Sequence, residues 1–212
     1  MIDNVLFDMD GTLVDSSEGI LDCLRRSINS VGYPMPSEQV LRSFIGPSLV
    51  WSYNSVLGMS EETTKKAIEN YVYEYSEKEG YKKFVLFDGI KELIKDLHDS
   101  GVKVSIVSAK PIPQLNKVVD YSGLRPYLDK VVGPQGEGKK DSDKSELIKI
   151  AKNGTNCVMV GDTDYDISSA KKAGITSIAV TYGFGFSKHA DTGADYTVSS
   201  VKELREILLR AD

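Results

Sequence analysis

From about residue 84 to the C-terminus, short apolar runs alternate with segments whose apolar residues recur at helical spacing. Gly101, Gly123 and Gly174 stand where several of the helical segments stop, a position where a left-handed residue commonly ends a helix. Repeated strand and helix units predict a mostly parallel sheet covered by helices on both faces, because each parallel connection must cross a face of the sheet. We therefore expect an α/β fold that binds its ligand beyond the carboxyl ends of the strands.

The expected elements follow from the spacing of the apolar residues, which differs between strands and helices. The predicted strands are residues 5–7, 84–87, 102–107, 130–132, 157–160, 178–181 and 196–198. The predicted helices of this part are residues 89–100, 111–122, 144–152, 166–173 and 201–209.

Residues 16–80 interrupt the alternation, because their apolar positions recur only at helical spacing. The segments with that spacing are residues 20–31, 40–45, 50–57 and 67–75. We predict an all-helical subdomain over residues 16–81, inserted into a core domain made of residues 1–15 and 82–212. The hinges between the two are expected near residues 15–17 and 81–84.

The sequence VLFDMDGTLVDS, residues 5–16, places two acidic residues directly after an apolar run. Asp8 and Asp10 are two positions apart, so on an extended chain their side chains point to the same side. Like charges about 4 Å apart repel by roughly 4 kcal/mol at an effective dielectric constant of about 20. We therefore expect a cation there, and Mg²⁺ prefers carboxylate and phosphate oxygens. A solvated turn is the alternative, whereas an EF-hand loop is excluded because Leu6 and Ser17 would have to be its first and last ligands.

Acidic and hydroxyl residues also follow two later apolar runs. The run VMVG leads into Asp162, Asp164 and Asp166, and a helix cap accounts for only one of these carboxylates. Three carboxylates together at a strand end are costly without a cation. Ser108 ends another apolar run, where its hydroxyl and the Ala109 amide can donate to a phosphate oxygen, although such a serine often caps the next helix instead.

Three lysines, Lys139, Lys140 and Lys144, precede or begin a predicted helix. Asp143 and Glu146 have the spacing of a capping box, which makes Lys144 the first helical residue. A cation in the first turn opposes the helix dipole, so helix stability alone does not favour a lysine there. Lys144 and the helix terminus would, however, attract one anion together.

Two glycine-rich segments match only part of a nucleotide-binding motif. Residues 133–139 fit the start of a P-loop, but Lys140 stands where that loop has serine or threonine. Residues 183–188, GFGFSK, lack the third glycine of a dinucleotide-binding fingerprint. Neither segment predicts a nucleotide-binding loop.

The formal net charge of −5 argues against nucleic acid or an anionic membrane as the main partner. No apolar run is long enough to span a bilayer, and the N-terminal residues do not form a signal peptide, so we predict a cytoplasmic protein. We expect a monomer or a weak homo-oligomer. Cys23 and Cys157 are expected to be buried thiols, and His98 and His189 have no partners at zinc-like spacing.

The segment DMDGTLVDS resembles the first motif of the haloacid dehalogenase-like (HAD) phosphohydrolases, and three further motifs follow in the order found in that superfamily. The resemblance covers residues 5–174 and implies a Rossmann-like core with a helical cap inserted after the first motif. It also implies that Asp8 attacks the phosphoryl group and that Asp10 is the general acid and base. Ser108 resembles the second motif.

The sequence KSELI at 144–148 resembles the third motif, so Lys144 is the first choice for its lysine and Lys139 the second. In the fourth motif, GDxxxD, the resemblance makes Asp162 a direct Mg²⁺ ligand, and Asp166 supports the ion through water or by contact with its ligands. Asp164 lies between the matched positions and is expected to cap the helix. The predicted catalytic residues are Asp8, Asp10, Ser108 and Lys144; the predicted phosphate-binding residues are Gly11, Ser108, Ala109 and Lys144; and the predicted metal ligands are Asp8, Asp10 through its backbone carbonyl, Asp162 and Asp166.

Residues 44–49, FIGPSL, and 181–185, TYGFG, resemble phosphoglycolate phosphatase-like members and their relatives that act on nucleoside monophosphates. The predicted function is Mg²⁺-dependent hydrolysis of a small phosphorylated metabolite through an aspartyl-phosphate, with phosphoglycolate as the leading substrate. The alternatives are a 5'-nucleotidase, a pyrophosphatase, a phosphomutase resembling β-phosphoglucomutase and a non-catalytic phosphate-binding protein. Arg42 either grips a substrate carboxylate or is a solvated arginine, and Lys110 is expected to be a solvated lysine.

Overall fold

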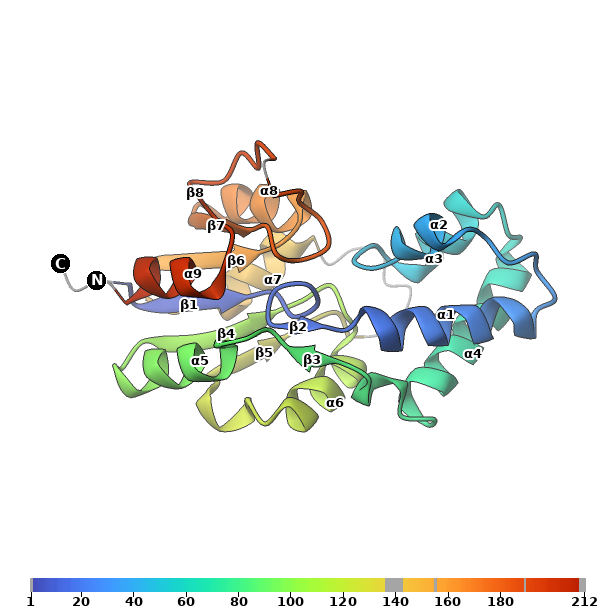
Figure 1. Ribbon diagram of the computed structural model, residues 1–212, viewed down its shortest axis with the longest axis horizontal. Helices are drawn as coiled ribbons and strands as arrows, with labels where there is room; N and C mark the ends of the chain where they lie inside the picture. Colours follow the sequence, from blue (N-terminus) through green and yellow to red (C-terminus); the bar gives the residue numbers. More distant parts are fainter. Residues whose placement is uncertain (1, 136–142, 155, 189, 210–212) are drawn as a thin grey trace.

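The computed structural model describes residues 2–135, 143–154, 156–188 and 190–209 (Figure 1). Its centre is a six-stranded sheet in the order β5-β4-β1-β6-β7-β8, in which every strand pair is parallel. The strands are β1 (Asn4–Phe7), β4 (Lys103–Val107), β5 (Lys130–Val132), β6 (Cys157–Gly161), β7 (Thr176–Val180) and β8 (Tyr196–Val198). The predicted α/β fold with a mostly parallel sheet is therefore confirmed.

Helices cover both faces of this sheet (Figure 1). They are α5 (Ile90–Asp99), α6 (Ile112–Ser122), α7 (Lys144–Ala151), α8 (Asp164–Ala173) and α9 (Val201–Leu208). The side chains of β1 alternate between the faces: Leu6 belongs to a buried cluster with residues of α7 and α8, whereas Val5 and Phe7 belong to a cluster with residues of α5, α6 and α9. Burial on both faces explains why the strand reads as an unbroken apolar run.

Residues 16–80 contain helices as their only regular elements, as predicted. These are α1 (Ser17–Ser30), α2 (Glu38–Arg42), α3 (Leu49–Trp51), a π-helix (Ser52–Val56), α4 (Glu61–Ser76) and a 3₁₀ turn beginning at Gly80. Figure 1 shows them grouped beyond one end of the sheet, on the side opposite the first residues of β1. Their buried side chains, such as Leu24 and Tyr53, belong to the same apolar cluster as Phe7. Their treatment as a separate cap subdomain stays a prediction.

The apolar run at residues 84–87 differs from its predicted place. Only β3 (Val85–Leu86) is extended, and it pairs antiparallel with β2 (Val14–Asp15) instead of joining the parallel sheet. Val85 is 65% exposed, so the run does not have the burial that a central strand needs. The two chain segments that connect the helical insertion to the sheet are thus bonded to each other.

The two cysteines lie where the sequence predicts. Cys23 and Cys157 are both buried and carry free thiols.

Within the described ranges, no helix has the length and apolar character needed to cross a membrane.

Candidate active site

Three predicted site residues stand at the carboxyl ends of neighbouring strands. Asp8 follows β1, Ser108 follows β4 and Asp162 follows β6, and β1 lies between the other two strands. The parallel pairing continues into the site, because the Asp8 amide donates to the Val160 carbonyl at 2.9 Å and the Ser108 amide donates to the Val132 carbonyl at 3.1 Å. The backbone of the sheet therefore fixes where these side chains begin.

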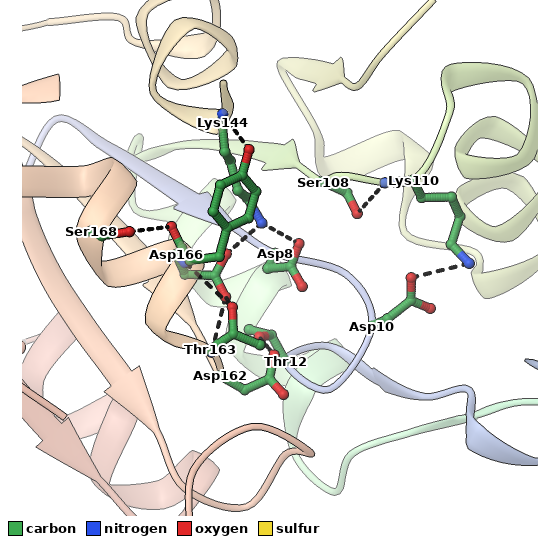
Figure 2. Close-up of polar contacts among 11 residues, drawn as sticks. Asp8, Asp10, Thr12, Ser108, Lys110, Lys144, Asp162, Thr163, Asp166 and Ser168 are labelled. Atoms are coloured by element: carbon green, nitrogen blue, oxygen red, sulfur yellow. Dashed lines mark hydrogen bonds and ion pairs between the residues drawn. The ribbon is translucent and has the colours of Figure 1, made fainter. Parts of the chain in front are cut away.

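Lys144 brings a buried positive charge to the end of β1. Its side chain is 3% exposed, and Nζ donates to Asp8 Oδ1 at 2.6 Å and also pairs with Asp166 Oδ1 (Figure 2). Lys144 is the first residue of α7, as predicted, and Asp143 caps that helix by accepting from the Ser145 amide at 3.1 Å. The predicted reciprocal contact of Glu146 is not seen, because its carboxylate pairs with a lysine one turn later in α7. Lys139 and Lys140 lie outside the described residues.

Asp162 is buried and accepts three hydrogen bonds from two distant parts of the chain. It accepts from the amides of Phe184 and Gly185 at 2.8 and 3.3 Å and from the Thr12 hydroxyl at 3.3 Å. Sequence reasoning missed this role of residues 183–185, which it considered only as a weak nucleotide-binding fingerprint. The close approach explains the glycines: a Cβ on Gly183 would lie 2.5 Å from the Asp162 Cβ.

Asp166 is held by the start of α8. Its Oδ2 accepts from the Thr163 amide at 3.0 Å and from the Thr163 hydroxyl at 2.6 Å, while the Thr163 hydroxyl caps the Asp166 amide. The prediction that Asp164 caps this helix is wrong. Asp164 is exposed and follows the cap, because the hydroxyl of Thr163 occupies the N-cap position one residue earlier.

The carboxylates of Asp8, Asp162 and Asp166 meet in one buried cluster, with ligand oxygens all within 4.8 Å of one another. Lys144 supplies one positive charge to these three acidic groups. Burial raises the pKa of Asp8 from 3.8 to about 8, against the opposing effect of Lys144, and burial raises the pKa of Asp162 to about 6. The cluster thus lacks positive charge, and its oxygen donors fit a hard divalent cation such as Mg²⁺.

Asp10 is bonded to a different set of residues from those around Asp8. Its Oδ1 accepts from the Ser16 hydroxyl at 2.6 Å, and its Oδ2 lies 3.0 Å from the Lys110 ammonium. Figure 2 shows Asp10 and Lys110 apart from the Lys144 group. The expectation of a solvated lysine at 110 is wrong, because its side chain is only 10% exposed and pairs with Asp10.

Two of the residues predicted to bind phosphate, Gly11 and Ser108, have partners within the chain. The Gly11 amide donates to the Val14 carbonyl at 2.8 Å, and Ser108 Oγ accepts from the Lys110 amide at 3.2 Å. Ser108 does not cap the next helix, α6, which has Pro111 at its N-cap and no side-chain cap. Gly11 has a φ of +85°, and a Cβ there would lie 2.2 Å from Asp162 Oδ2, so glycine is needed for this close approach. The phosphate-binding roles of Gly11, Ser108 and Ala109 stay predictions.

Arg42 lies outside this cluster. Its side chain is 56% exposed and pairs with Glu38, one turn earlier in α2, at 3.4 Å. The arrangement is that of a solvated surface pair, which was the alternative to carboxylate recognition.

The chain is similar to known proteins over almost its full length. The model of the haloacid dehalogenase-like hydrolase family matches residues 5–180. The tyrosine-protein kinase PtkA of Mycobacterium tuberculosis is 29% identical over 96% of this chain and 72% of its own length. A 5'-nucleotidase of Pseudomonas aeruginosa is 30% identical over 86% of this chain and 84% of its own length. A phosphoglycolate phosphatase of Vibrio parahaemolyticus is 27% identical over 96% of this chain and 95% of its own length.

A solved structure of a predicted phosphatase from Clostridium acetobutylicum superposes on this chain with a TM-score of 0.86. The two chains are 34% identical, and 99% of each is covered. The fold described above, including the helical insertion, is therefore that of a solved relative.

Proposed function

The chain belongs to the haloacid dehalogenase-like hydrolases and is a phosphatase of that family, and from this premise we propose that it hydrolyses a small phosphate monoester by way of an aspartyl-phosphate on Asp8. The observation that carries the proposal is that two neighbouring acids, Asp8 and Asp10, have different hydrogen-bond and ion-pair partners. Asp8 is held by Lys144 beside two further buried carboxylates, whereas Asp10 is held by Ser16 and Lys110. One acid can therefore attack while the other moves a proton.

In the proposed first step, Asp8 attacks phosphorus in line with the leaving oxygen. Lys144 holds Oδ1, and among the described residues Oδ2 has no hydrogen-bond partner, so Oδ2 is the oxygen that attacks. The bond between phosphorus and the leaving oxygen breaks, and Asp10 gives its proton to that oxygen. In the second step Asp10 takes a proton from a water that attacks the phosphorus of the aspartyl-phosphate. Inorganic phosphate leaves and the Asp8 carboxylate is restored.

We propose that Mg²⁺ is held by the carboxylates of Asp8 and Asp162 and by the Asp10 backbone carbonyl, with Asp166 acting through water. The deficit of positive charge in this cluster supports the assignment. A bound Mg²⁺ would offset the repulsion between the Asp8 carboxylate and a phosphate dianion. Lys144 neutralises part of the same repulsion, and Thr12 with the amides of residues 184 and 185 orients Asp162.

The metal assignment predicts how stability depends on pH. Because the pKa of Asp162 is raised from 3.8 to about 6 and that of Asp8 to about 8, the folded chain binds these protons more tightly than the unfolded chain does. In EDTA the Tm should therefore fall as pH rises from about 4 to about 8. Mg²⁺ favours the ionised carboxylates, so the rise in Tm that it causes should grow with pH over this range. Thermal melts with EDTA and with Mg²⁺ decide this, and a Mg²⁺ effect that is absent or independent of pH would contradict the assignment.

Phosphoglycolate is the substrate we propose first, because phosphoglycolate phosphatases are among the relatives that align over nearly the whole chain. A nucleoside monophosphate comes next, since the 5'-nucleotidase relative is 30% identical. Release of inorganic phosphate from phosphoglycolate, nucleotides, sugar phosphates, pyrophosphate and p-nitrophenyl phosphate, with Mg²⁺ and with EDTA, tests the proposal. Lack of Mg²⁺-dependent release from every ester would refute it. The cytoplasmic location and the monomeric or weakly oligomeric state stay predictions.

Replacing Asp10 by asparagine should separate proton transfer from nucleophilic attack. Formation of the phosphoenzyme from an alkyl phosphate should slow by about a hundredfold or more, because its alcohol leaves poorly without a proton. The same step with p-nitrophenyl phosphate should slow much less, since nitrophenolate leaves without protonation. Single-turnover measurements on both esters check this, and equal losses would show that Asp10 is not the general acid.

A further inference from the structure

Lys110 is a cation whose side chain is mostly covered, and it lies where the helical insertion contacts the sheet domain. Its ammonium lies 3.0 Å from Asp10 Oδ2 and donates to the hydroxyl of Tyr75, a residue of α4, at 2.7 Å. The same ammonium lies 4.6 Å from the centre of the Tyr75 ring. Two of its three N–H groups thus have partners, and the proposed mechanism uses this residue only to hold Asp10.

Two tyrosine hydroxyls beside Lys110 have hydrogen atoms without an acceptor. The Tyr75 hydroxyl accepts from Lys110, but it donates to no group in the part of the chain that the structure describes. Tyr71 stacks on Tyr75, with ring centres 5.6 Å apart and planes 11° apart, and forms no hydrogen bond to a described residue. Burial raises the pKa of both hydroxyls, so both remain donors at neutral pH. Both hydroxyls can therefore donate to an added acceptor.

The position of this donor cluster relates it to the leaving group. Asp10 is the residue proposed to protonate the leaving oxygen, and Lys110 is in direct contact with Asp10. A group two or three bonds beyond the leaving oxygen would therefore lie within reach of the ammonium. One positive charge and two hydroxyl donors match the single charge and two oxygens of a carboxylate, whereas a phosphate dianion would leave one negative charge without a partner.

We propose that Lys110, Tyr75 and Tyr71 form a subsite for a carboxylate carried by the leaving alcohol. The proposal rests on the proposed phosphatase function and names its substrate class, the phosphate esters of short hydroxy acids. The proposal assigns recognition of the carboxylate to Lys110, which contacts Asp10 and is only 10% exposed, and not to Arg42, which pairs with Glu38 on the surface of α2. Nucleoside monophosphates, whose leaving group is neutral, gain nothing from this subsite.

The test compares two esters that differ only in the group of interest. Phosphoglycolate carries a carboxylate where 2-hydroxyethyl phosphate carries a neutral CH₂OH group. The wild-type chain should prefer phosphoglycolate in kcat/KM by about thirtyfold or more, and Lys110→Met should reduce that preference to less than about threefold. The preference is the quantity measured, because loss of Lys110 also alters Asp10 and can slow both esters. Lys110→Arg, which keeps the charge, should retain most of the preference.

Lys117 provides the matched control. It lies on α6 and also contacts the end of α4, where its ammonium donates to the Ser76 carbonyl at 3.1 Å, but it does not contact Asp10. Lys117→Met should therefore leave the preference within about twofold of wild type, within the usual range for a surface charge. Tyr75→Phe, which keeps the ring and removes the hydroxyl, should lower the preference by about threefold to tenfold.

Two results would overturn the inference. The first is that the wild-type enzyme hydrolyses both esters equally well. The second is that the Lys110→Met variant folds, as judged by its melting curve, and keeps the full preference for phosphoglycolate. If Lys110→Met does not fold, an unchanged preference in Tyr75→Phe has the same meaning. Failure of the proposed function is distinct, because the wild-type chain would then release phosphate from neither ester nor from p-nitrophenyl phosphate.

Discussion

Replacing Asp8 by asparagine is expected to lower kcat/KM for every phosphate ester by at least about a thousandfold, or roughly 4 kcal/mol of transition-state stabilisation. The substitution keeps the size of the side chain and removes the charge that attacks phosphorus. It also leaves Lys144 with Asp166 as its remaining acidic partner and weakens the cluster that we propose for Mg²⁺. Steady-state release of inorganic phosphate measures the loss.

Asp164→Asn is the matched control for this substitution. It makes the same chemical change at a residue that lies between Asp162 and Asp166 in the sequence. Asp164 is, however, exposed and lies outside the buried cluster. Its kcat/KM should stay within about threefold of wild type, since exposed residues away from special contacts contribute little. Activity of Asp8→Asn within tenfold of wild type would refute the role of Asp8 as nucleophile.

Replacing Lys144 by methionine is expected to damage both activity and stability. Methionine keeps an unbranched side chain of similar length but leaves the buried carboxylates of Asp8 and Asp166 without their shared cation. Removing one partner of a buried ion pair typically costs about 3–5 kcal/mol, so the free energy of unfolding in EDTA should fall by about that amount. With Mg²⁺ present, kcat/KM should fall by about a hundredfold or more, because one of the charges that offset the phosphate dianion is missing.

Lys149→Met controls for the loss of a lysine from the same helix. Lys149 is 53% exposed and pairs with Glu146 on the surface of α7, so its removal should change the free energy of unfolding by less than about 1 kcal/mol. Urea denaturation and phosphate release on the two variants give the comparison. Near wild-type activity in Lys144→Met would instead favour Lys139, the second choice from the sequence.

Much of the site could be predicted because each part of it is encoded locally. An apolar run that ends in acids or a serine defines a strand end, and β1, β4 and β6 follow that pattern. A capping residue directly before Lys144 defines the start of α7, where the structure also places it. In a parallel sheet these ends meet at one edge, so local patterns were enough to bring Asp8, Asp162 and Lys144 together.

The rest depends on contacts between residues far apart in sequence, which leave no local pattern. Lys110 has the sequence context of a surface residue, and only the packing of α4 against α6 buries it beside Tyr75 and Asp10. The amides of residues 184 and 185 reach Asp162 because the chain after β7 folds back over it. The pairing of β3 with β2 is also a contact between distant residues, because these strands lie directly before and shortly after the helical insertion in the sequence.

Local competition accounts for the error at Asp164 and for the two alternatives that the sequence left open at Arg42. Thr163 and Asp164 are both good capping residues, and the periodicity of the apolar side chains does not distinguish between them. Arg42 precedes the bend at residues 46–47 in sequence, but it also stands one helical turn after Glu38, which pairs with it on the surface.

Trapping of a phosphoenzyme tests the central claim most directly. Wild type, Asp10→Asn and Asp8→Asn are mixed with p-nitrophenyl phosphate and Mg²⁺, quenched in acid within the first turnover and analysed by mass spectrometry of the intact chain and its peptides. We expect one phosphoryl group on the peptide that contains Asp8, and hydroxylamine should remove it. This phosphoenzyme should be more abundant in Asp10→Asn, because hydrolysis of the intermediate is slowed. It should be absent from Asp8→Asn. Release of inorganic phosphate by wild type with no phosphoryl group on the chain in either wild type or Asp10→Asn would contradict the central claim.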